Sequence, residues 1–371
     1  MQSLFNNYFQ LVLDKQTPFY SLHQKHNAKL ISFAGYTMPI QYEGVSVEHN
    51  HVRNCVGVFD VSHMGQILIK GSGAFDLVQK LTTNNILKLD NGKAQYSCML
   101  NIDGGIIDDL LVYRLSQNSY MLVVNGANAQ KDLNWICDQK NKNVSVVDIT
   151  NERCLLAIQG PQAHSVLQKL TPVELTSIPY YSFQIGRFAD CDNIIISNTG
   201  YTGAGGFEIY FDKQFASTIW DKLFSSNDLI KPIGLAARDT LRLEMGYCLY
   251  GNDINESRSP IEAGLSWIVS MKKDFIGKDV ISKQLENGVQ EKLVGFLLEE
   301  KGIPRKDYKI YNQTGTLIGS VTSGTMSPFF KKGFGMGYVI KQDAFINNTI
   351  FISIRNRKVK ATIIKPPFYE K

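Results

Sequence analysis

The chain has 371 residues, of which 44% are hydrophobic and 20% are charged. Both fractions are ordinary for a globular protein with a buried core, and the length suggests two or three domains. Lysine and arginine total 39 against 34 aspartates and glutamates, which gives a net charge of +5. Because no run of five or six like charges concentrates this excess, nucleic-acid binding is not expected.

The six cysteines form no C-x-x-C pair, so we expect free thiols in a reducing compartment. His49 and His51 are near neighbours without the surrounding pattern of a metal site, and no metal is expected. No segment reaches the roughly 18–20 apolar residues of a membrane span. Residues 1–16 lack the basic start, continuous apolar core and cleavage site of a secretion signal. The sequence therefore predicts a cytoplasmic protein with no membrane partner.

Strands and helices alternate over the first two thirds of the chain. Residue alternation and helical spacing of apolar side chains distinguish the two kinds of element. The predicted elements are, in order, strand 66–70, helix 73–81, strands 106–113 and 120–124, helix 128–137, strand 154–158, a helix that ends at 170, and strand 193–197. This order suggests two related α+β units. Another helix is predicted to begin at Pro232 and to end at Gly246.

The pattern changes after about Gly288. Short predicted strands, separated by glycine and asparagine turns, lie at 292–298, 309–311, 316–322, 337–340 and 349–354. They predict a small all-β barrel or sandwich. The polar stretch 283–291 is the expected linker, so we predict domains of residues 1–287 and 288–371. The glycine clusters at 203–206 and 333–337 do not fit a nucleotide fingerprint and are expected in turns.

Three short segments carry polar residues where apolar ones would be expected, and we call them polar islands. The first is G-G-I-I-D-D-L-L-V-Y at 104–113, where two aspartates interrupt an apolar strand. Side chains alternate along a strand, so Asp108 and Asp109 point to opposite faces, and Asp109 shares its face with Leu111 and Tyr113. Two interpretations stay open. In the first, both aspartates reach solvent or cap a turn. In the second, one aspartate is buried and pairs with a ligand or partner, because an unpaired buried carboxylate is costly.

The second island, N-T-G-Y-T-G-A-G-G-F-E at 198–208, is rich in glycine. Such a loop brings the backbone close to whatever covers it, and Tyr201 offers a flat ring for stacking. Glu208 faces away from Phe207 and Ile209 if the segment is extended. Spacing alone slightly favours a hairpin with an exposed glutamate over a ligand site.

The third island is G-L-A-A-R-D-T-L-R-L-E at 234–244. Arg238 and Arg242 are four residues apart and share a helix face. A pair of Asp239 and Arg242 within the helix is the commoner explanation of this pattern. The alternative is that the two arginines bind an anion or meet carboxylates in a cleft.

Taken together, the islands resemble the aminomethyltransferase (T protein) family of the glycine cleavage system. The resemblance extends from Thr17 to Tyr369, and its specificity comes from the order of the motifs rather than from any one of them. The matching stretches are T-P-F-Y-S-L-H, F-A-G-Y-T-M-P-I-Q-Y, G-V-F-D-V-S-H-M-G, G-K-A-Q-Y-S, G-G-I-I-D-D-L-L-V-Y, L-V-V-N-G-A-N, I-Q-G-P, T-G-Y-T-G, G-L-A-A-R-D-T-L-R-L-E, L-Y-G-N-D-I-N-E, T-S-G-T-M-S-P and K-P-P-F-Y.

The resemblance implies an α+β protein folded as a three-domain cloverleaf ring, with two related folate-binding α+β units, a C-terminal β-barrel and folate in the central hole. It implies that Asp109 is the catalytic aspartate. The residues that it places against the folate, or next to it, are Tyr96, Tyr113, Tyr201, Glu208, Arg238 and Arg242. A reduced pterin presents adjacent N–H donors that a carboxylate such as Glu208 can accept, and tyrosines stack on its rings.

The implied reaction moves a one-carbon unit from an aminomethyl group on the lipoyl arm of the glycine cleavage H protein to tetrahydrofolate. Ammonia is released, and 5,10-methylenetetrahydrofolate and the dihydrolipoyl carrier are formed. Tetrahydrofolate is a co-substrate in this scheme, and no metal is required. The implied partners are the H protein and the other glycine cleavage components. A carboxylate at Asp109 would stabilise the positive charge that develops during transfer.

Two other functions on the same fold stay as alternatives. Folate-binding relatives that maintain iron–sulfur clusters carry a K-G-C-Y-x-G-Q-E motif where this chain has Leu249 to Glu256, L-Y-G-N-D-I-N-E. A folate-dependent demethylase acting on a small N- or S-methyl compound is the other. The chain also departs from the family at Tyr36, where tryptophan is frequent, and at Ala204-Gly205, where an acidic residue is frequent.

Overall fold

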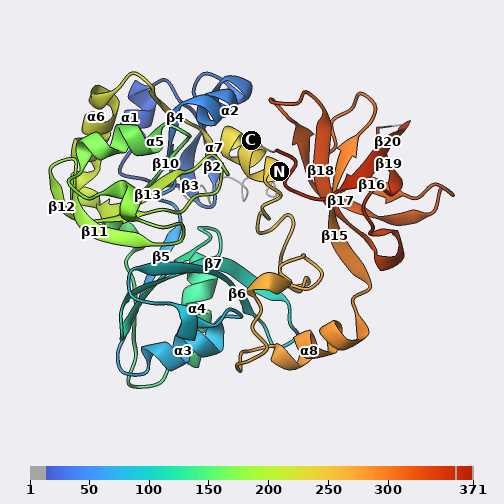
Figure 1. Cartoon of the computed structure of the whole chain (residues 1–371), viewed down its shortest axis with the longest axis horizontal. Coiled ribbons are helices and arrows are strands. Elements are labelled where there is room, and N and C mark those ends of the chain that lie inside the picture. Colours follow the sequence, from blue (N-terminus) through green and yellow to red (C-terminus); the bar gives the residue numbers. More distant parts are fainter. Residues whose placement is uncertain (1–13, 356, 370–371) are drawn as a thin grey trace, which may run out of the picture.

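A computed structural model describes residues 14–355 and 357–369, so most of the stretch that was tested for a secretion signal lies outside the described residues. Three lobes form a ring (Figure 1). Two lobes are α+β units and the third is a closed six-stranded barrel. The expected α+β class and C-terminal barrel are confirmed. No helix within the described ranges has the length and apolar character that a membrane crossing requires.

The five-stranded unit is an antiparallel sheet with the strand order β6-β7-β8-β5-β9. Its strands are β5 (Gly65–Lys70), β6 (Lys93–Leu100), β7 (Ile106–Ser116), β8 (Ser119–Val124) and β9 (Ser145–Asp148). Helices α3 (Ala74–Leu81) and α4 (Ala129–Gln139) cover one face, where their apolar side chains pack against Leu110 and Val112. The predicted elements of this region are confirmed to within a few residues at their ends.

The six-stranded unit has the order β11-β12-β13-β10-β4-β14. Its strands are β4 (Val56–Asp60), β10 (Arg153–Gln159), β11 (Phe183–Phe188), β12 (Cys191–Ser197), β13 (Gly206–Asp212) and β14 (Ile230–Pro232). The helices packed on one face are α1 (Tyr20–Lys25), α5 (Ala163–Leu167) and α6 (Ala216–Ser226). Pro232 does not begin a helix, because it ends a short strand that pairs with β4.

The two units share one connectivity. In the first, β5, α3, the three strands β6 to β8, α4 and β9 follow one another along the chain. In the second, β10, α5, the three strands β11 to β13, α6 and β14 follow in the same order. The sheet orders also agree once β4, which lies between β10 and β14, is set aside. Because the uncovered faces of both sheets contribute to one core, which contains Tyr113, Met121, Leu155 and Tyr210, the units pack face to face.

A small sheet and two helices complete the region around the ring's centre. The sheet has the order β1-β3-β2 and consists of β1 (Lys15–Gln16), β2 (Lys29–Phe33) and β3 (Tyr36–Gln41). Its β2–β3 hairpin turns at Ala34-Gly35, whose φ angles of 52° and 76° suit a tight hairpin turn. Helix α7 (Leu235–Glu244) packs against α2 (Val45–Asn54), β3 and the barrel, so it joins the lobes.

The segment expected as a linker contains a helix instead. Helix α8 (Lys278–Asn287) covers most of 283–291 and ends at Gly288, whose φ is 81°. Its Ile281 is fully buried in a core formed by residues of β6, β7 and the loop between α7 and α8, which explains why a polar stretch is nevertheless ordered. Short 3₁₀ helices lie at Ile86–Lys88, Thr150–Glu152, Gln168–Leu170, Leu175–Ser177, Lys213–Phe215, Ser266–Ile268 and Lys341–Asp343.

The barrel closes in the order β15-β18-β17-β16-β19-β20. Its strands are β15 (Glu291–Leu298), β16 (Lys309–Tyr311), β17 (Leu317–Met326), β18 (Gly333–Ile340), β19 (Thr349–Ile354) and β20 (Arg357–Ile364). The glycines at 333–337 lie in β18 and not in a turn, so that expectation was wrong. A side chain on Gly335 would come within 2.3 Å of the Ser323 carbonyl oxygen, so the close approach of two strands requires glycine there.

Candidate functional site

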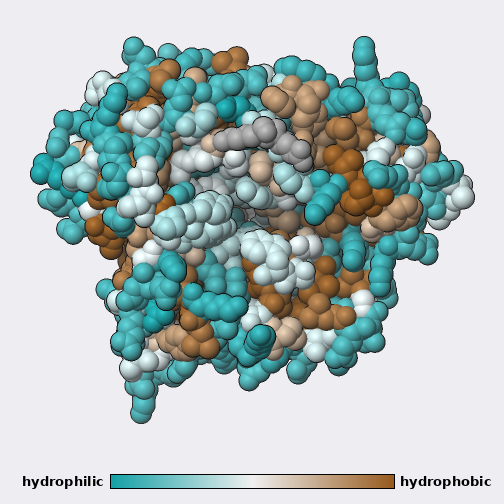
Figure 2. Space-filling model, viewed as in Figure 1, coloured by the Kyte–Doolittle hydropathy of each residue, from teal (hydrophilic) through white to brown (hydrophobic). Residues whose placement is uncertain are grey.

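A cavity of about 1450 Å³ lies at the centre of the ring. Its wall is shared by all three lobes, with Asp109 and Asn125 from the five-stranded unit, Glu208 from the six-stranded unit and Met336 from the barrel. Figure 2 shows a hollow between the lobes on the face viewed there. The volume exceeds the roughly 300–1,000 Å³ of a pocket for one drug-sized ligand. Two reacting groups can therefore meet inside it.

Asp109 lies on β7 and lines this cavity, as the alternation of the strand predicts. Its Oδ2 accepts a 2.9 Å hydrogen bond from the Tyr96 hydroxyl on β6, and its Oδ1 accepts one of 2.9 Å from the side-chain amide of Asn125. Asp108 points to the opposite face, towards α4, and is fully buried. Of the two adjacent carboxylates, only Asp109 can reach a ligand in the cavity.

Burial raises the pKa of Asp109 above the ordinary value of an aspartate, and the nearby charge of Asp108 raises it further. The hydrogen bonds from Tyr96 and Asn125 act in the opposite direction, because they stabilise the ionised carboxylate. Because these effects oppose one another, a ligand that brings positive charge would strongly stabilise the ionised form of Asp109. The arrangement suits a group that stabilises a developing cation.

Glu208 on β13 and Arg238 on α7 face the same cavity. Glu208 is 6% exposed, and its Oε2 accepts a hydrogen bond from the Thr199 hydroxyl. Burial raises the pKa of Glu208, whereas the Thr199 hydrogen bond and the charge of Arg238 lower it. The Nη1 atom of Arg238 is buried and has no hydrogen-bond partner among the described residues. An acceptor atom on a bound ligand would satisfy this buried, unpaired guanidinium nitrogen.

Aromatic rings flank these polar groups. The rings of Tyr201 and Tyr247 stack with centroids 5.7 Å apart and an interplanar angle of 24°. The Arg238 guanidinium lies over the Tyr201 ring at 4.7 Å, and the Tyr201 hydroxyl donates to the carbonyl oxygen of Cys248. Tyr201 is therefore fixed from two sides, and with Tyr247 it forms a flat apolar wall suited to a planar ligand.

Tyr113 shares a strand face with Asp109 as predicted, but it does not line the cavity in the described part of the chain. Its ring is fully buried in the core between the two units. Its hydroxyl lies 2.8 Å from the Tyr210 hydroxyl and 3.2 Å from Oγ1 of Thr199, the residue that binds Glu208. Tyr113 thus lies behind the Glu208 carboxylate and not in contact with the cavity.

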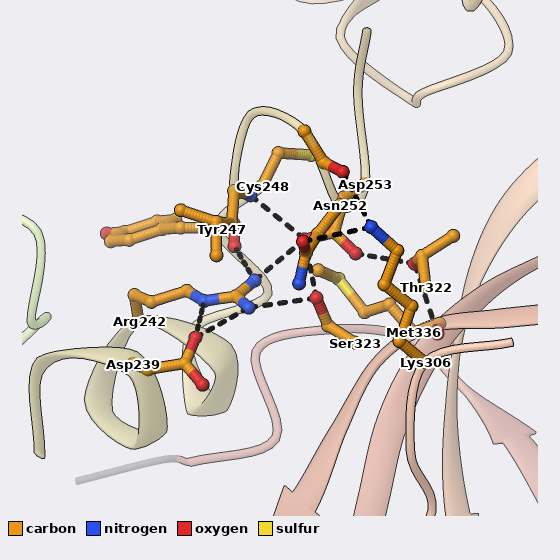
Figure 3. A network of polar contacts seen from close by, with 12 residues as sticks. Asp239, Arg242, Tyr247, Cys248, Asn252, Asp253, Lys306, Thr322, Ser323 and Met336 are labelled. Carbon is orange, nitrogen blue, oxygen red and sulfur yellow. Dashed lines mark hydrogen bonds and ion pairs between the residues drawn. The ribbon is translucent and has the colours of Figure 1, made fainter. Parts of the chain in front are cut away.

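Arg242 shares a helix face with Arg238 but has a different environment (Figure 3). Its Nε donates to Oδ1 of Asp239, with which its Nη2 forms an ion pair; its Nη1 donates to the Tyr247 carbonyl oxygen and to Asp253, and its Nη2 donates to Ser323. These contacts engage all three nitrogens of the guanidinium. The pair of Asp239 and Arg242 expected from spacing is confirmed. Arg242 connects α7 to the barrel and also lines the cavity.

Sequence reasoning assigned no individual role to Asn125, His63, Tyr247 or Trp267, all of which line the cavity. Trp267 is 67% exposed and its ring lies 5.9 Å from that of Tyr96, so it stands at the cavity's edge. Burial lowers the pKa of His63 to about 4, so its imidazole is neutral near pH 7. Asn125 and His63 do fall within quoted motifs, but the spacing gives no sign of their position. Among residues 14–355 and 357–369, no group of three or more His, Cys, Asp or Glu is placed to hold a metal ion.

Comparisons with known proteins agree with this architecture. A family model described as the GCVT N-terminal domain matches residues 19–273, and one described as the glycine cleavage T-protein C-terminal barrel domain matches residues 291–370. The aminomethyltransferase of Flavobacterium psychrophilum is 52% identical to this chain, over 96% of the chain and 100% of the relative. That of Bacteroides thetaiotaomicron is 51% identical, over 95% of the chain and 99% of the relative.

A solved structure gives the same result. The glycine cleavage system aminomethyltransferase T of Bartonella henselae superposes with a TM-score of 0.90 at 34% identity, over 96% of this chain and 98% of that one. The chain belongs to the glycine cleavage T-protein family. Its activity is accordingly that of an aminomethyltransferase of the glycine cleavage system, as the resemblance predicted.

Proposed function

We propose that this chain takes the methylene carbon of an aminomethyl group on the lipoyl arm of the H protein and transfers it to tetrahydrofolate within the central cavity. The carbon loses its bonds to sulfur and to nitrogen and gains two bonds to folate nitrogens. The two protons lost from those nitrogens leave on the carrier thiol and on ammonia. The observation that carries the proposal is that one cavity contains a carboxylate, Asp109, beside a separate polar pair, Glu208 and Arg238.

The polar pair and the aromatic wall fit a reduced pterin. Glu208 presents a buried carboxylate that can accept the adjacent ring N–H and amino donors of the pterin. The unused Nη1 donor of Arg238 supplies the complementary hydrogen bond to a carbonyl oxygen. Tyr201 and Tyr247 provide flat surfaces for stacking. We assign folate contacts to Tyr96, Tyr201, Glu208 and Arg238, and supporting positions to Tyr113 and Arg242.

Asp109 is the catalytic residue in this proposal. Bound tetrahydrofolate supplies the nitrogen nucleophiles, and the chain's contribution is orientation and charge. The carboxylate of Asp109 is held by Tyr96 and Asn125 before substrates arrive, so little reorganisation is needed when positive charge develops at the transferred carbon. The surrounding apolar wall lowers the local dielectric and strengthens that interaction. Asp108 cannot take this part, because it faces α4.

We further propose a cellular location for the protein and a role for its net charge. The six cysteines are free, which supports a reducing compartment and the expected cytoplasmic location. We also propose that the positive net charge of the chain assists the approach of an acidic carrier. No metal takes part in the proposed transfer, since the charge to be stabilised is positive and a carboxylate serves that purpose.

The decisive experiment supplies the purified protein with a carrier loaded with the aminomethyl group. Ammonia and 5,10-methylenetetrahydrofolate should form in equal amounts, and only when both carrier and tetrahydrofolate are present. The loaded carrier also separates this function from the two alternatives of the same fold. A protein that converts a small methylated amine but not the loaded carrier would be a demethylase, and the proposal would be wrong.

A further inference from the structure

Asp132 is a buried carboxyl group that the proposed transfer does not use. It lies in the first turn of α4 and has no exposed surface. Neither of its side-chain oxygens receives a hydrogen bond from an N–H or O–H group of the described residues. Its carboxyl group adjoins that of Asp108, which is also fully buried, and the two carboxyl groups influence each other's ionisation. Two carboxylates in such contact cannot both be ionised at low cost, because the like charges repel and water is excluded.

Asp108 differs from Asp132 because several neighbouring groups donate hydrogen bonds to it. Its Oδ2 accepts from the Asn125 backbone N–H at 2.9 Å. Its Oδ1 accepts from the side-chain amides of Asn125 at 2.9 Å and Asn128 at 2.6 Å. These donors favour the ionised form of Asp108, whereas Asp132 has none that would favour its own. The proton that the pair must keep therefore belongs mainly to Asp132.

The one nearby cation that the structure describes, Lys131, lowers the pKa of Asp132 less than burial and the charge of Asp108 raise it. Lys131 is the adjacent basic residue on α4, but its Nζ donates to the Ile107 carbonyl oxygen, the Tyr250 hydroxyl and Glu256, at 2.8, 2.9 and 2.8 Å. The titratable and charged groups that face the Asp108–Asp132 pair from the packed elements are Asp109 on β7, Cys98 on β6, Tyr250 in the loop after α7, and Lys131. Of these only Lys131 is cationic, and it is occupied.

We propose that Asp108 and Asp132 hold a single proton between them in the folded protein, and that Asp132 acts as a positioning residue for Asp109. The O–H of Asp132 donates to Asp108, and Asp108 fixes the amide of Asn125. The same amide donates 2.9 Å hydrogen bonds to Asp108 and to Oδ1 of Asp109. A row of side chains thus runs from the core of the five-stranded unit to the cavity. The positioning part rests on the role proposed for Asp109, whereas the shared proton does not.

The shared proton has a measurable consequence for stability. Burial, and then the charge of Asp108, raise the pKa of Asp132 above its unfolded value. The unfolded chain therefore releases this proton as pH rises above the ordinary range of an aspartate, while the folded protein keeps it. Folding must take up a proton in this window, and the folding equilibrium constant falls by about tenfold per pH unit. The loss continues until the pH reaches the raised pKa of the folded state.

The test is Asp132→Asn, which keeps a donor towards Asp108 but cannot ionise. Denaturant unfolding of the full chain is measured between about pH 5.5 and 8 for both proteins. The ratio of the variant's folding constant to that of the wild type should rise by up to about tenfold per pH unit. Asp138→Asn, an exposed position on the same helix, is the matched control and should give a constant ratio. A constant ratio for Asp132→Asn as well would overturn the shared proton.

Two further measurements test the shared proton and the positioning of Asp109 separately. At neutral pH the infrared difference spectrum between the wild type and Asp132→Asn should contain one carbonyl band of a protonated carboxylic acid. For positioning, Asp132→Asn should retain turnover, whereas Asp132→Ala should lower kcat with little change in the KM for tetrahydrofolate. If the asparagine variant is as slow as the alanine variant, the positioning role is wrong. The stability and infrared results do not depend on aminomethyl transfer, so they test the proton even if the proposed role of Asp109 fails.

Discussion

The hydroxyl of Tyr96 donates a 2.9 Å hydrogen bond to Oδ2 of Asp109 across two neighbouring strands of the five-stranded sheet. This contact stabilises the ionised carboxylate against the burial and the Asp108 charge that raise its pKa. The protonation of Asp109 is therefore set by a small number of identifiable contacts. It follows that removing one of them should change how activity depends on pH.

We expect turnover to be lost as pH falls through the raised pKa of Asp109, because the protonated group no longer stabilises positive charge. Tyr96→Phe should move this loss to higher pH by about one to two units, since a hydrogen bond to a charged group contributes roughly 1.5–3 kcal/mol and one pKa unit corresponds to about 1.36 kcal/mol. The measurement is kcat against pH for both proteins. Tyr311→Phe, in the barrel, is the control. An unchanged profile in Tyr96→Phe would contradict the assignment.

Replacing Asp109 itself should have the largest effect on catalysis. Asp109→Asn keeps the size and polarity of the side chain but removes its charge, and we expect turnover to fall by roughly two to three orders of magnitude. Affinity for tetrahydrofolate should fall less, because the contacts of Glu208 and Arg238 remain. Asp108→Asn is the comparison. It should lower the free energy of unfolding and change turnover only mildly, because Asp108 lies in the core. If Asp108→Asn is inactive and Asp109→Asn is active, the roles must be exchanged.

Glu208→Ala should weaken tetrahydrofolate binding. Each hydrogen bond to a charged group contributes about 1.5–3 kcal/mol, so the dissociation constant should rise by at least about tenfold. Isothermal titration calorimetry gives the value directly, and a thermal melt establishes that the variant is folded. Glu286→Ala, at an exposed position on α8, serves as the control. Wild-type affinity in folded Glu208→Ala would exclude this residue from the folate site.

Arg242→Ala should act through stability. The side chain is 1% exposed and pairs with Asp253, which is fully buried, so its removal leaves an uncompensated charge in the core. We expect a loss of about 3–5 kcal/mol in the free energy of unfolding, measured by denaturant titration. Arg187→Ala breaks an ion pair with Asp190 on the surface and should cost about 0–1 kcal/mol. Equal losses in the two variants would mean that the network in Figure 3 contributes little.

Salt should affect the two substrates differently. Rim charges act mainly on association rates and are screened by salt. If the positive excess of the chain attracts an acidic carrier, a higher salt concentration should raise the KM for the loaded carrier more than the KM for tetrahydrofolate. Initial-rate kinetics over a series of salt concentrations, at constant pH, provide the comparison. Equal sensitivity of both constants would argue against electrostatic attraction of the carrier.

The parts of the site that depend on local periodicity could be predicted from the sequence. A strand has a period of two residues, so the opposite directions of Asp108 and Asp109 follow from adjacency alone. The pairing of Asp239 with Arg242 follows from helical spacing in the same way. The order of elements that suggested two related units is also local, and the matching sheet orders agree with it.

The parts that depend on distant residues could not be predicted. Arg238 and Arg242 look equivalent along α7, and they differ only because Asp253 and Ser323 come from other segments to use the donors of Arg242. Tyr113 continues the face of Asp109, but the six-stranded unit packs over it and removes it from the cavity. The helix at 278–287 was missed because its sequence is polar and only Ile281 anchors it. The domain division at 287/288 stays a prediction.

The shared wall of the cavity has a consequence for the order in which the protein matures. Wall residues extend from Phe33, at the β2–β3 hairpin, to Pro366, beyond the last barrel strand. A growing chain can fold its two α+β units as they emerge, since N-terminal domains fold first during synthesis. The cavity wall, however, is incomplete until residue 366 has been made and the barrel has docked. A ligand that contacts all three lobes can therefore stabilise only the assembled ring.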